Sequence, residues 1–232
     1  MLIWLALACK EPPDPVDSAD SADTAPEVLR GALSFALPLA EPEAFDQVVG
    51  VDHDPEVHEG IEELLCTDYA GRGFPWCYDE HDGSDYLLEG SWDRMDAGSV
   101  AVLAAASGEV VDLDDGNYDR CHGDLGTGGV SCDGHPRRAN YVIIEHAGGV
   151  RSRYWHLKTD SVAVTIGQQV ACGEVLGLVG SSGNSSQPHL HFEVEGADGV
   201  VIDPYAGPWS QPETWWAEQN DPEALPGTTC VD

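Results

Sequence analysis

The chain has 232 residues, which is long enough to bury a sizeable core as one all-β domain or as two small domains. Its 42 acidic and 10 basic residues give a formal net charge of −32, which argues against nucleic-acid binding and against electrostatic adhesion to anionic lipid. No apolar run approaches the roughly 18 residues that a membrane-spanning helix needs. We therefore expect no nucleic-acid partner and no transmembrane segment.

The N-terminal stretch MLIWLALA is apolar and leads directly into Cys9. Residues 1–8 resemble a bacterial lipoprotein signal, after which Cys9 would become the lipidated first residue of the mature protein. An ordinary secretory signal or a frayed apolar terminus is the alternative. We expect a protein that is anchored by lipid on the periplasmic side of the cell envelope rather than spanning the membrane, or else a secreted one.

Residues 9–29 begin with this lipid-attachment cysteine and continue with repeated Asp, Ser, Ala and Pro and no aromatic side chain. Such a segment cannot bury enough apolar surface to fold, so we expect a disordered acidic linker. The folded domain is expected to occupy residues 30–232.

An even number of cysteines follows Cys9, which together with an export signal indicates disulfides in an oxidising compartment. Six cysteines allow many connectivities, and pairing sequence neighbours is the simplest. It gives three expected bridges: Cys66–Cys77, Cys121–Cys132 and Cys172–Cys230. A zinc site made of cysteines is the alternative, but no pair has the close C-x-x-C spacing typical of one.

From residue 33 onward, short strand-like runs alternate with glycine-rich turns. Residues 99–116 predict two strands around a turn, residues 139–157 predict a hairpin that turns at Gly148-Gly149, and residues 164–180 continue the pattern. Helix is expected only as a turn or two near residues 61–65 and 212–219. The pattern favours an all-β domain of predominantly antiparallel sheets.

Residues 188–194 alternate between apolar and polar side chains, which predicts a strand. The apolar positions, which would face the core, are Leu190, Phe192 and Val194. His189 and His191 would then share the other face, about 7 Å apart. The two imidazoles are either solvated polar groups on a half-buried strand or members of a metal or catalytic site.

A second cluster of polar residues lies upstream in CYDEHDGSDYLLEG, where His81 and Asp85 are four residues apart. A neutral imidazole and a carboxylate oxygen are both good zinc ligands, and a flexible Gly83 would let the short segment turn both toward one point. The alternative is a solvated acidic turn.

Four motifs in this order resemble the lysostaphin and LytM-type zinc metallopeptidases, which cut peptidoglycan cross-links. The motifs are HDGSD, VLAAASGEVV, YWHL and GQQVACGEVLGLVGSSGNSSQPHLHFEV. The resemblance implies an all-β fold of the barrel-sandwich hybrid (duplicated hybrid motif) type, which in this chain would be stapled by the disulfides expected from its cysteines. It also implies one Zn²⁺ held by His81, Asp85 and His191, with His156 and His189 as the catalytic pair, and peptidoglycan peptide stems as the substrate.

The chemistry of these residue types agrees with that assignment. Two histidines and one carboxylate leave a tetrahedral Zn²⁺ one open position, which is typical of a catalytic site. Water in that position would have its pKa lowered to about 7. His156 or His189 could accept the water's proton, and the other could hydrogen-bond the developing oxyanion. In a Gram-negative envelope, the expected target is the D-Ala to diaminopimelate cross-link.

Three other functions can be weighed against this one, and the last of them is discounted. A non-catalytic peptidoglycan-binding regulator of a wall amidase would usually lack one or more of these five residues, whereas this chain keeps all of them. A D-alanyl-D-alanine metallopeptidase would share the His-x-His strand but usually separates its upstream His and Asp further. A lipoyl or biotinyl carrier would resemble residues 164–180, yet the modifiable lysine is missing at the turn.

The segment CHGDLGTGGVSC, residues 121–132, is an insertion relative to the family pattern. A closed loop there could rim the substrate groove or be a stapled surface excursion. We favour the excursion, since most loops carry no function.

Overall fold

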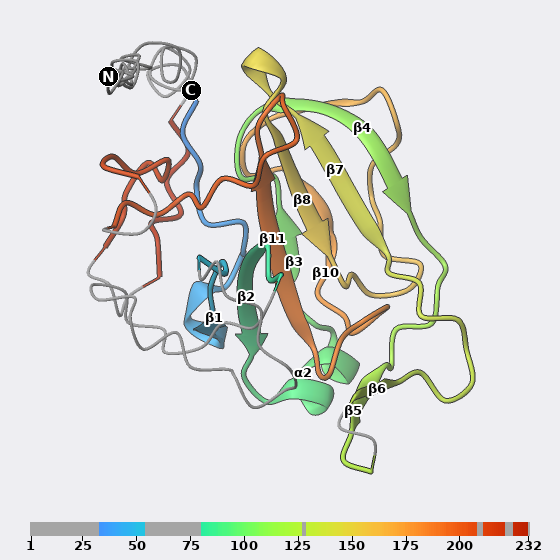
Figure 1. Cartoon of the computed structure of the whole chain (residues 1–232). Coiled ribbons are helices and arrows are strands. Elements are labelled where there is room, and N and C mark those ends of the chain that lie inside the picture. Colours follow the sequence, from blue (N-terminus) through green and yellow to red (C-terminus); the bar gives the residue numbers. More distant parts are fainter. Residues whose placement is uncertain (1–32, 54–79, 127–128, 208–210, 221–224, 232) are drawn as a thin grey trace, which may run out of the picture.

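The computed structural model describes residues 33–53, 80–126, 129–207, 211–220 and 225–231 of the chain (Figure 1). The expected signal, Cys9 and the linker lie outside the described residues. The expected helix near residues 61–65 and the expected Cys66–Cys77 disulfide also lie outside them.

A seven-stranded antiparallel sheet dominates the described part of the chain, with the strand order β1-β2-β11-β8-β7-β4-β9. The strands are β1 Phe45–Val49, β2 Gly83–Leu88, β4 Gly108–Asp114, β7 Tyr141–Glu145, β8 Arg151–Trp155, β9 Gln169–Val170 and β11 His189–Glu195. The predicted all-β fold of predominantly antiparallel sheets is confirmed.

Two small sheets accompany the large one. Strand β3, Ala101–Leu103, pairs with β10, Val175–Leu178, and strand β5, His122–Asp124, pairs with β6, Gly129–Ser131. Residues from β3 and β10 share one hydrophobic cluster with the apolar side of β11, so these sheets enclose a common core. In Figure 1 the β5–β6 hairpin projects from the lower edge of the molecule.

The alternation predicted for β11 is confirmed. Leu190, Phe192 and Val194 are fully buried in the core, and the opposite side carries both histidines. The predicted hairpin is also present as β7 and β8, joined by the 3-10 turn η2 at Ala147–Gly149. Its turn needs glycine because Gly148 and Gly149 have φ values of 75° and 78°.

The helix predicted over residues 212–219 is wrong. This stretch forms turns and an isolated bridge in which Phe35 N–H donates to Trp215 O and Ala217 N–H donates to Phe35 O, each at 2.8 Å. Trp215 and Trp216 are both 2% exposed. Burial of two adjacent aromatic rings around residue 35 overrides the weak helical preference of the segment.

A short helix, α2 at Ser91–Ala97, was not predicted from the sequence. It follows Gly90, which has a φ of 71°, and buries Met95 against the core. Besides η2, the described residues contain one more 3-10 turn, η1 at Pro42–Ala44. In the described part of the chain, no helix has both the length and the apolar character needed to cross a bilayer.

Two of the predicted disulfides are confirmed: Cys121–Cys132 and Cys172–Cys230. The first closes the β5–β6 hairpin. The second ties the C-terminal segment to the turn that precedes β10 and closes a much longer loop, 58 residues against 11. Each should stabilise the fold by about 2 to 4 kcal/mol by restricting the unfolded chain.

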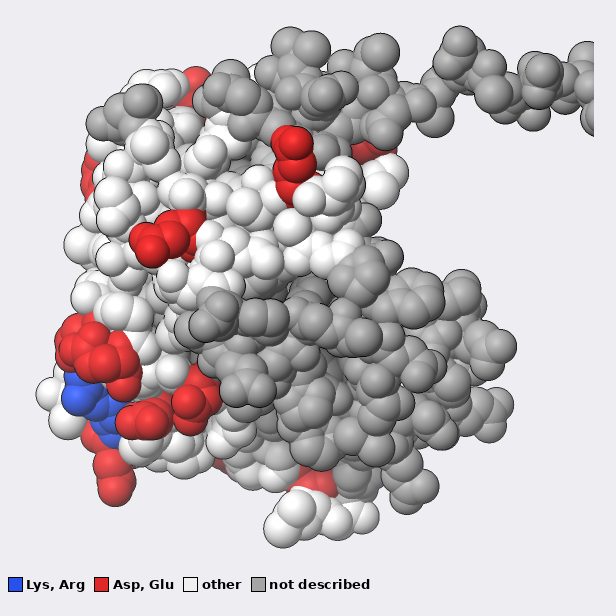
Figure 2. All heavy atoms as spheres, turned by 90° about the vertical axis from the view of Figure 1, so that its left-hand side faces the viewer, with Lys and Arg blue, Asp and Glu red and all other residues white. Residues whose placement is uncertain are grey.

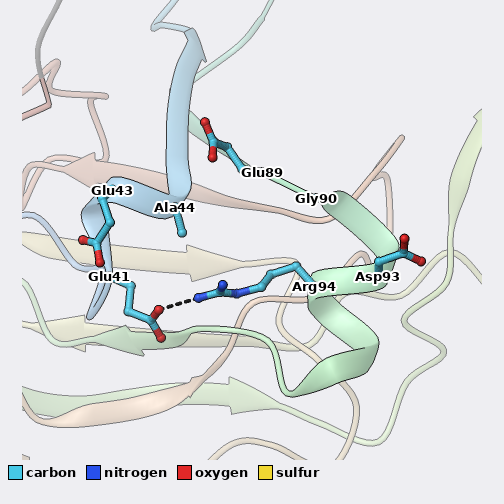
Figure 3. A pocket seen from close by; sticks show the side chains of 7 residues that line it. All are labelled: Glu41, Glu43, Ala44, Glu89, Gly90, Asp93 and Arg94. Carbon is cyan, nitrogen blue, oxygen red and sulfur yellow. Dashed lines mark hydrogen bonds and ion pairs between the residues drawn. The ribbon is translucent and has the colours of Figure 1, made fainter.

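The acidic composition is visible on the surface. Figure 2 shows a face on which the described charged side chains are mostly Asp and Glu. A depression of about 460 Å³ lies beside η1 and the start of α2 (Figure 3). Its charged lining residues are Glu41, Glu43, Glu89, Asp93 and Arg94, and Arg94 forms an ion pair with Glu41. The depression contains none of the five predicted site residues.

Candidate metal centre

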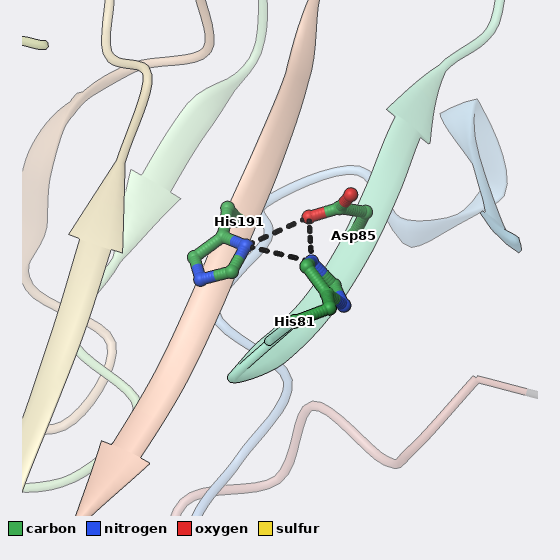
Figure 4. Close-up of side chains that lie close together, drawn as sticks. All are labelled: His81, Asp85 and His191. Atoms are coloured by element: carbon green, nitrogen blue, oxygen red, sulfur yellow. Dashed lines mark hydrogen bonds and ion pairs between the residues drawn. The ribbon is translucent and has the colours of Figure 1, made fainter. Parts of the chain in front are cut away.

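The three residues predicted as metal ligands lie together on neighbouring strands (Figure 4). The β2–β11 register places Asp85 opposite His191, and His81 lies just before β2. His191 Nδ1 is 2.9 Å from Asp85 Oδ1 and 3.1 Å from His81 Nε2, which is itself 3.2 Å from Asp85 Oδ1. Donor atoms that share a tetrahedral zinc ion with bonds of about 2.0 Å lie about 3.3 Å apart. The triangle therefore has nearly the size that one ion requires.

Hydrogen bonds behind the histidines orient their lone pairs toward this triangle. His81 Nδ1 lies 2.6 Å from the carbonyl oxygen of Gly50, and His191 Nε2 lies 3.2 Å from Asp82 Oδ1. Each of these nitrogens can donate an N–H outward, so that in the neutral form of each ring the other nitrogen has a lone pair facing Asp85. Two imidazole nitrogens and one carboxylate oxygen directed at one point fit a divalent cation.

Burial and charge shape the ionisation of the site. Burial raises the pKa of the Asp85 carboxyl, but the electrostatic interactions with the neighbouring His81 and His189 and the hydrogen bond from His191 outweigh it and hold the pKa well below its usual range. Burial lowers the pKa of His191, but Asp82 and Asp85 outweigh it and raise the pKa to about 10. In the metal-free protein His191 therefore holds a proton between two carboxylates, and a bound cation must displace it.

A second group of donor atoms, from Asp82, His191 and Glu193, also lies within 4.8 Å. The side chain of Asp82 is 49% exposed, whereas all three residues of the first group are buried. The first group is therefore better able to exclude water from three sides of an ion.

Gly83 serves a role that the sequence did not predict. It lies in the regular strand β2, so the expected flexible turn is absent there. A Cβ atom at this position would lie 2.7 Å from His191 Nε2 and 2.6 Å from the carbonyl oxygen of Phe192. Glycine is required because the His191 imidazole occupies the space that a side chain would fill.

The two residues predicted as catalytic lie beside the triangle. The ring centroids of His156 and His189 are 4.6 Å apart, and His189 Nε2 lies 3.6 Å from Asp85 Oδ1. His156 follows β8 directly and has a φ of 64°, a left-handed conformation that a non-glycine residue adopts at a cost of about 1 kcal/mol or more. The structure thus brings together all five residues that the sequence singled out.

Backbone carbonyls fix the orientation of both rings. His156 Nδ1 lies 2.7 Å from Ser182 O, and His189 Nδ1 lies 2.7 Å from Gln187 O. With Nδ1 donating, each Nε2 is a proton acceptor. Burial lowers the pKa of His156 well below its usual range and also lowers the pKa of His189, so both rings are neutral at neutral pH.

The sequence reasoning missed the neighbours of this cluster on the same face of the sheet. Trp155 in β8 is the register partner of His191, so both side chains leave the sheet on the same side. The Trp155 ring contacts the ring of Tyr141 in β7, with centroids 4.5 Å apart. Both rings are partly exposed. Along β8 the buried residues Ser152 and Tyr154 alternate with partly exposed ones, and Trp155 is one of the partly exposed residues. A two-residue alternation predicted for this strand would have placed Trp155 on this face.

Residues 90–204 match the sequence model of peptidase family M23. The chain belongs to peptidase family M23. This confirms the resemblance to the lysostaphin and LytM-type peptidases. The matched residues include His156, His189 and His191, whereas His81 and Asp85 precede them.

Short stretches of this chain are similar in sequence to several named peptidoglycan-related proteins. It is 45% identical over 60 residues to peptidoglycan DD-endopeptidase ShyB of Vibrio cholerae, covering 26% of this chain and 14% of that protein. It is 40% identical over 80 residues to DD-carboxypeptidase/endopeptidase Mpg of Neisseria meningitidis, covering 34% and 18%. It is 38% identical over 68 residues to the murein hydrolase activator EnvC of Escherichia coli, covering 29% and 15%. The matches thus span less than a fifth of each relative.

Among solved structures, the catalytic domain of lysostaphin from Staphylococcus simulans is 25% identical, with a TM-score of 0.36 over 54% of this chain and 76% of that one. A likeness of this strength has no bearing on function.

Proposed function

We propose that this protein is a zinc-dependent endopeptidase that hydrolyses peptide cross-links of bacterial peptidoglycan. The observation that carries the proposal is the convergence of three buried donor atoms, from His81, Asp85 and His191, beside two oriented neutral imidazoles. Membership of family M23 and the names of the relatives ShyB and Mpg support the same reaction and substrate class.

In this proposal His81 Nε2, Asp85 Oδ1 and His191 Nδ1 hold one zinc ion. When bound, zinc supplies a Lewis acid and lowers the pKa of a coordinated water to about 7. The rings of His156 and His189 lie with their centroids 4.6 Å apart and are each bonded to a backbone carbonyl through Nδ1, so the Nε2 atom of one of them accepts the proton of the attacking water. The protonated ring can then donate a hydrogen bond from Nε2–H to the oxyanion and afterwards transfer that same proton to the leaving amine. A neutral ring that is protonated only at Nδ1 has no Nε2 proton to give.

The finer substrate assignment is the D-Ala to diaminopimelate cross-link. It is supported by the DD-endopeptidase name of ShyB and by the lipoprotein-like N-terminus, which favours a Gram-negative envelope. In the same proposal Cys9 carries the lipid anchor, and residues 10–28 tether the peptidase domain on the periplasmic side of the envelope.

A second candidate function is a non-catalytic activator of a wall amidase, which the likeness to EnvC favours. An activator that does not hydrolyse peptides has no need for a complete donor set with oriented imidazoles next to it. The donor set is complete here, so we place the endopeptidase first.

The test is digestion of purified cross-linked muropeptides by the zinc-loaded protein, followed by mass spectrometry of the products. We expect one new amine and one new carboxylate per bond cut, and no product with the matched variant Asp85→Asn. Zinc-loaded wild type that releases nothing, yet stimulates a wall amidase, would overturn the proposal in favour of the activator.

A further inference from the structure

The disulfide-closed hairpin of residues 121–132 is attached to the loop that leads into β11. Cys121 N–H donates to Ser181 O at 3.0 Å, and Gly123 N–H donates to Ser186 O at 2.9 Å. Cys132 Sγ lies 3.5 Å from Gly183 O. The hairpin therefore contacts the loop at three backbone carbonyls and is more than a free surface excursion.

The same loop supplies the acceptors that orient both proposed catalytic histidines. Ser182 O accepts from His156 Nδ1, and Gln187 O accepts from His189 Nδ1. Any shift of the loop against the sheet would move these two acceptors together. The hairpin thus contacts the loop whose carbonyls determine which nitrogen of each imidazole is protonated.

A chain of side-chain hydrogen bonds makes the connection to His189 direct. Ser181 Oγ donates to Cys121 O at 2.7 Å and lies 2.7 Å from Ser185 Oγ, and Ser185 Oγ lies 3.1 Å from His189 Nδ1. Ser185 Oγ also lies 2.9 Å from Gln187 O, the carbonyl that accepts from His189 Nδ1, so the single hydroxyl proton of Ser185 is shared between Gln187 O and Ser181 Oγ. Ser181 donates to the Cys121 carbonyl and can accept from Ser185, and Ser185 can in turn accept from the imidazole. Both serines are buried, with exposed fractions of 0% and 1%.

We propose that the Cys121–Cys132 hairpin is a positioning element. Through Ser181 and Ser185 it holds His189 in the Nδ1–H form with Nε2 facing the substrate, and through the backbone of the same loop it fixes the Ser182 carbonyl that orients His156. This inference rests on the proposed function, because it assigns these residues a part in the same reaction. The hydrogen bonds of the Ser181 and Ser185 hydroxyls go to Cys121 O, Gln187 O, His189 Nδ1 and each other rather than to the donor atoms of the metal ligands, so zinc binding should not depend on them.

Ser185→Ala tests the chain without breaking the disulfide. Outer partners of functional histidines typically contribute about 10-fold to 100-fold, and Gln187 O remains as a second acceptor, so we expect a fall in kcat of about tenfold. Zinc content and KM for cross-linked muropeptides should stay at the wild-type values. Ser186→Ala is the matched control, because its exposed side chain lies outside the chain while its backbone carbonyl bonds the hairpin. Wild-type kcat in Ser185→Ala would overturn the proposal.

The two disulfides provide a second, independent comparison. Replacing Cys121 and Cys132 together by Ser should lower kcat with zinc retained, whereas replacing Cys172 and Cys230 together by Ser should not. An equal loss of kcat in both paired variants would show a general effect on stability and overturn the positioning role. Ser185→Ala decides the question if the Cys121 variant does not fold.

Nitrogen NMR of the histidine rings separates this inference from the proposed function. We expect His189 of the zinc-loaded wild type to be protonated at Nδ1 and bare at Nε2, and Ser185→Ala to show a mixture of tautomers. If the wild type did not cleave muropeptides, the proposed function would be wrong. The NMR comparison of wild type with Ser185→Ala would still decide whether the hairpin positions His189. A wild-type His189 protonated at Nε2 would overturn the positioning role.

Discussion

Gly83→Ala is expected to remove most of the metal affinity of this protein. The added Cβ would lie 2.7 Å from Nε2 and 2.8 Å from Cε1 of His191, and 2.6 Å from the carbonyl oxygen of Phe192. Carbon contacts are most favourable at about 3.5 Å or more, so the imidazole would have to move by about 0.7 Å. The Phe192 carbonyl cannot retreat cheaply, since it belongs to a strand paired with β2 on one side and β8 on the other.

A shift of this size exceeds what a zinc ligand tolerates, because coordination distances in working sites stay within about 0.2 Å of their ideal values. We expect the zinc dissociation constant to rise at least about a hundredfold, more than for loss of an outer hydrogen-bond partner. The free energy of unfolding should also fall by about 1 to 3 kcal/mol, as for other overpacked sites.

Competition with a chromogenic chelator measures the affinity, and thermal unfolding of the metal-free protein measures the stability. Gly177→Ala in β10 is the matched control. Its Cβ would meet Leu157 Cδ1 and Ser161 Oγ at 3.3 Å, so it should cost some stability and leave zinc affinity unchanged. If Gly83→Ala bound zinc as tightly as the wild type, the role of Gly83 in seating His191 would be refuted.

Four further predictions follow from the same structure. Asp85→Ala should lose zinc and activity together, whereas His156→Ala should keep zinc and lose about 10² to 10⁴ in kcat, as metal analysis and muropeptide turnover will show. Trp155→Ala should raise KM about fivefold at unchanged zinc content, because an aromatic contact beside the metal is worth about 1 kcal/mol. Zinc affinity should rise with pH between 7 and 9, by up to about tenfold per pH unit. The reason is that zinc must displace the proton of His191, whose pKa is raised to about 10. A zinc affinity that does not change with pH in calorimetry would contradict this. Burial lowers the pKa of His146 below the unfolded value of about 6.5, so the unfolded state binds a proton on this ring first as the pH falls. The free energy of unfolding should therefore decrease below that pH, by at most about 1.4 kcal/mol per pH unit. His146→Gln should remove part of this pH dependence in denaturant titrations.

The sequence predicted those parts of the fold that depend on local pattern. The two-residue alternation around His189 and His191 predicts both the strand and the side of it that is buried. Gly148-Gly149 predicts the hairpin because its turn requires positive φ values. The helix predicted over residues 212–219 failed because long-range pairing with Phe35 outweighs local propensity.

The site was predictable as a set of residue types in a recognisable order, but not as a geometry. His191 and Asp85 are 106 positions apart, and only the β2–β11 register brings their atoms to 2.9 Å. Asp82 reads as one more acid of a solvated turn until the register places it behind His191. The contribution of Ser185 has no sequence signal at all, because serine-rich loops are common.

The antiparallel sheet explains how a buried carboxylate and two histidines can be held close together in this acidic protein. Opposite residues of paired strands stand about 5 Å apart on one face, which brings two donor groups together at almost no cost in side-chain freedom. A buried carboxylate such as Asp85 is nonetheless costly unless charge or hydrogen bonds compensate it. The proton held by His191 supplies that compensation in the metal-free protein, and a divalent cation would supply it when bound. The fold therefore keeps the donor set assembled without an ion, and we expect the strands not to rearrange when the metal enters.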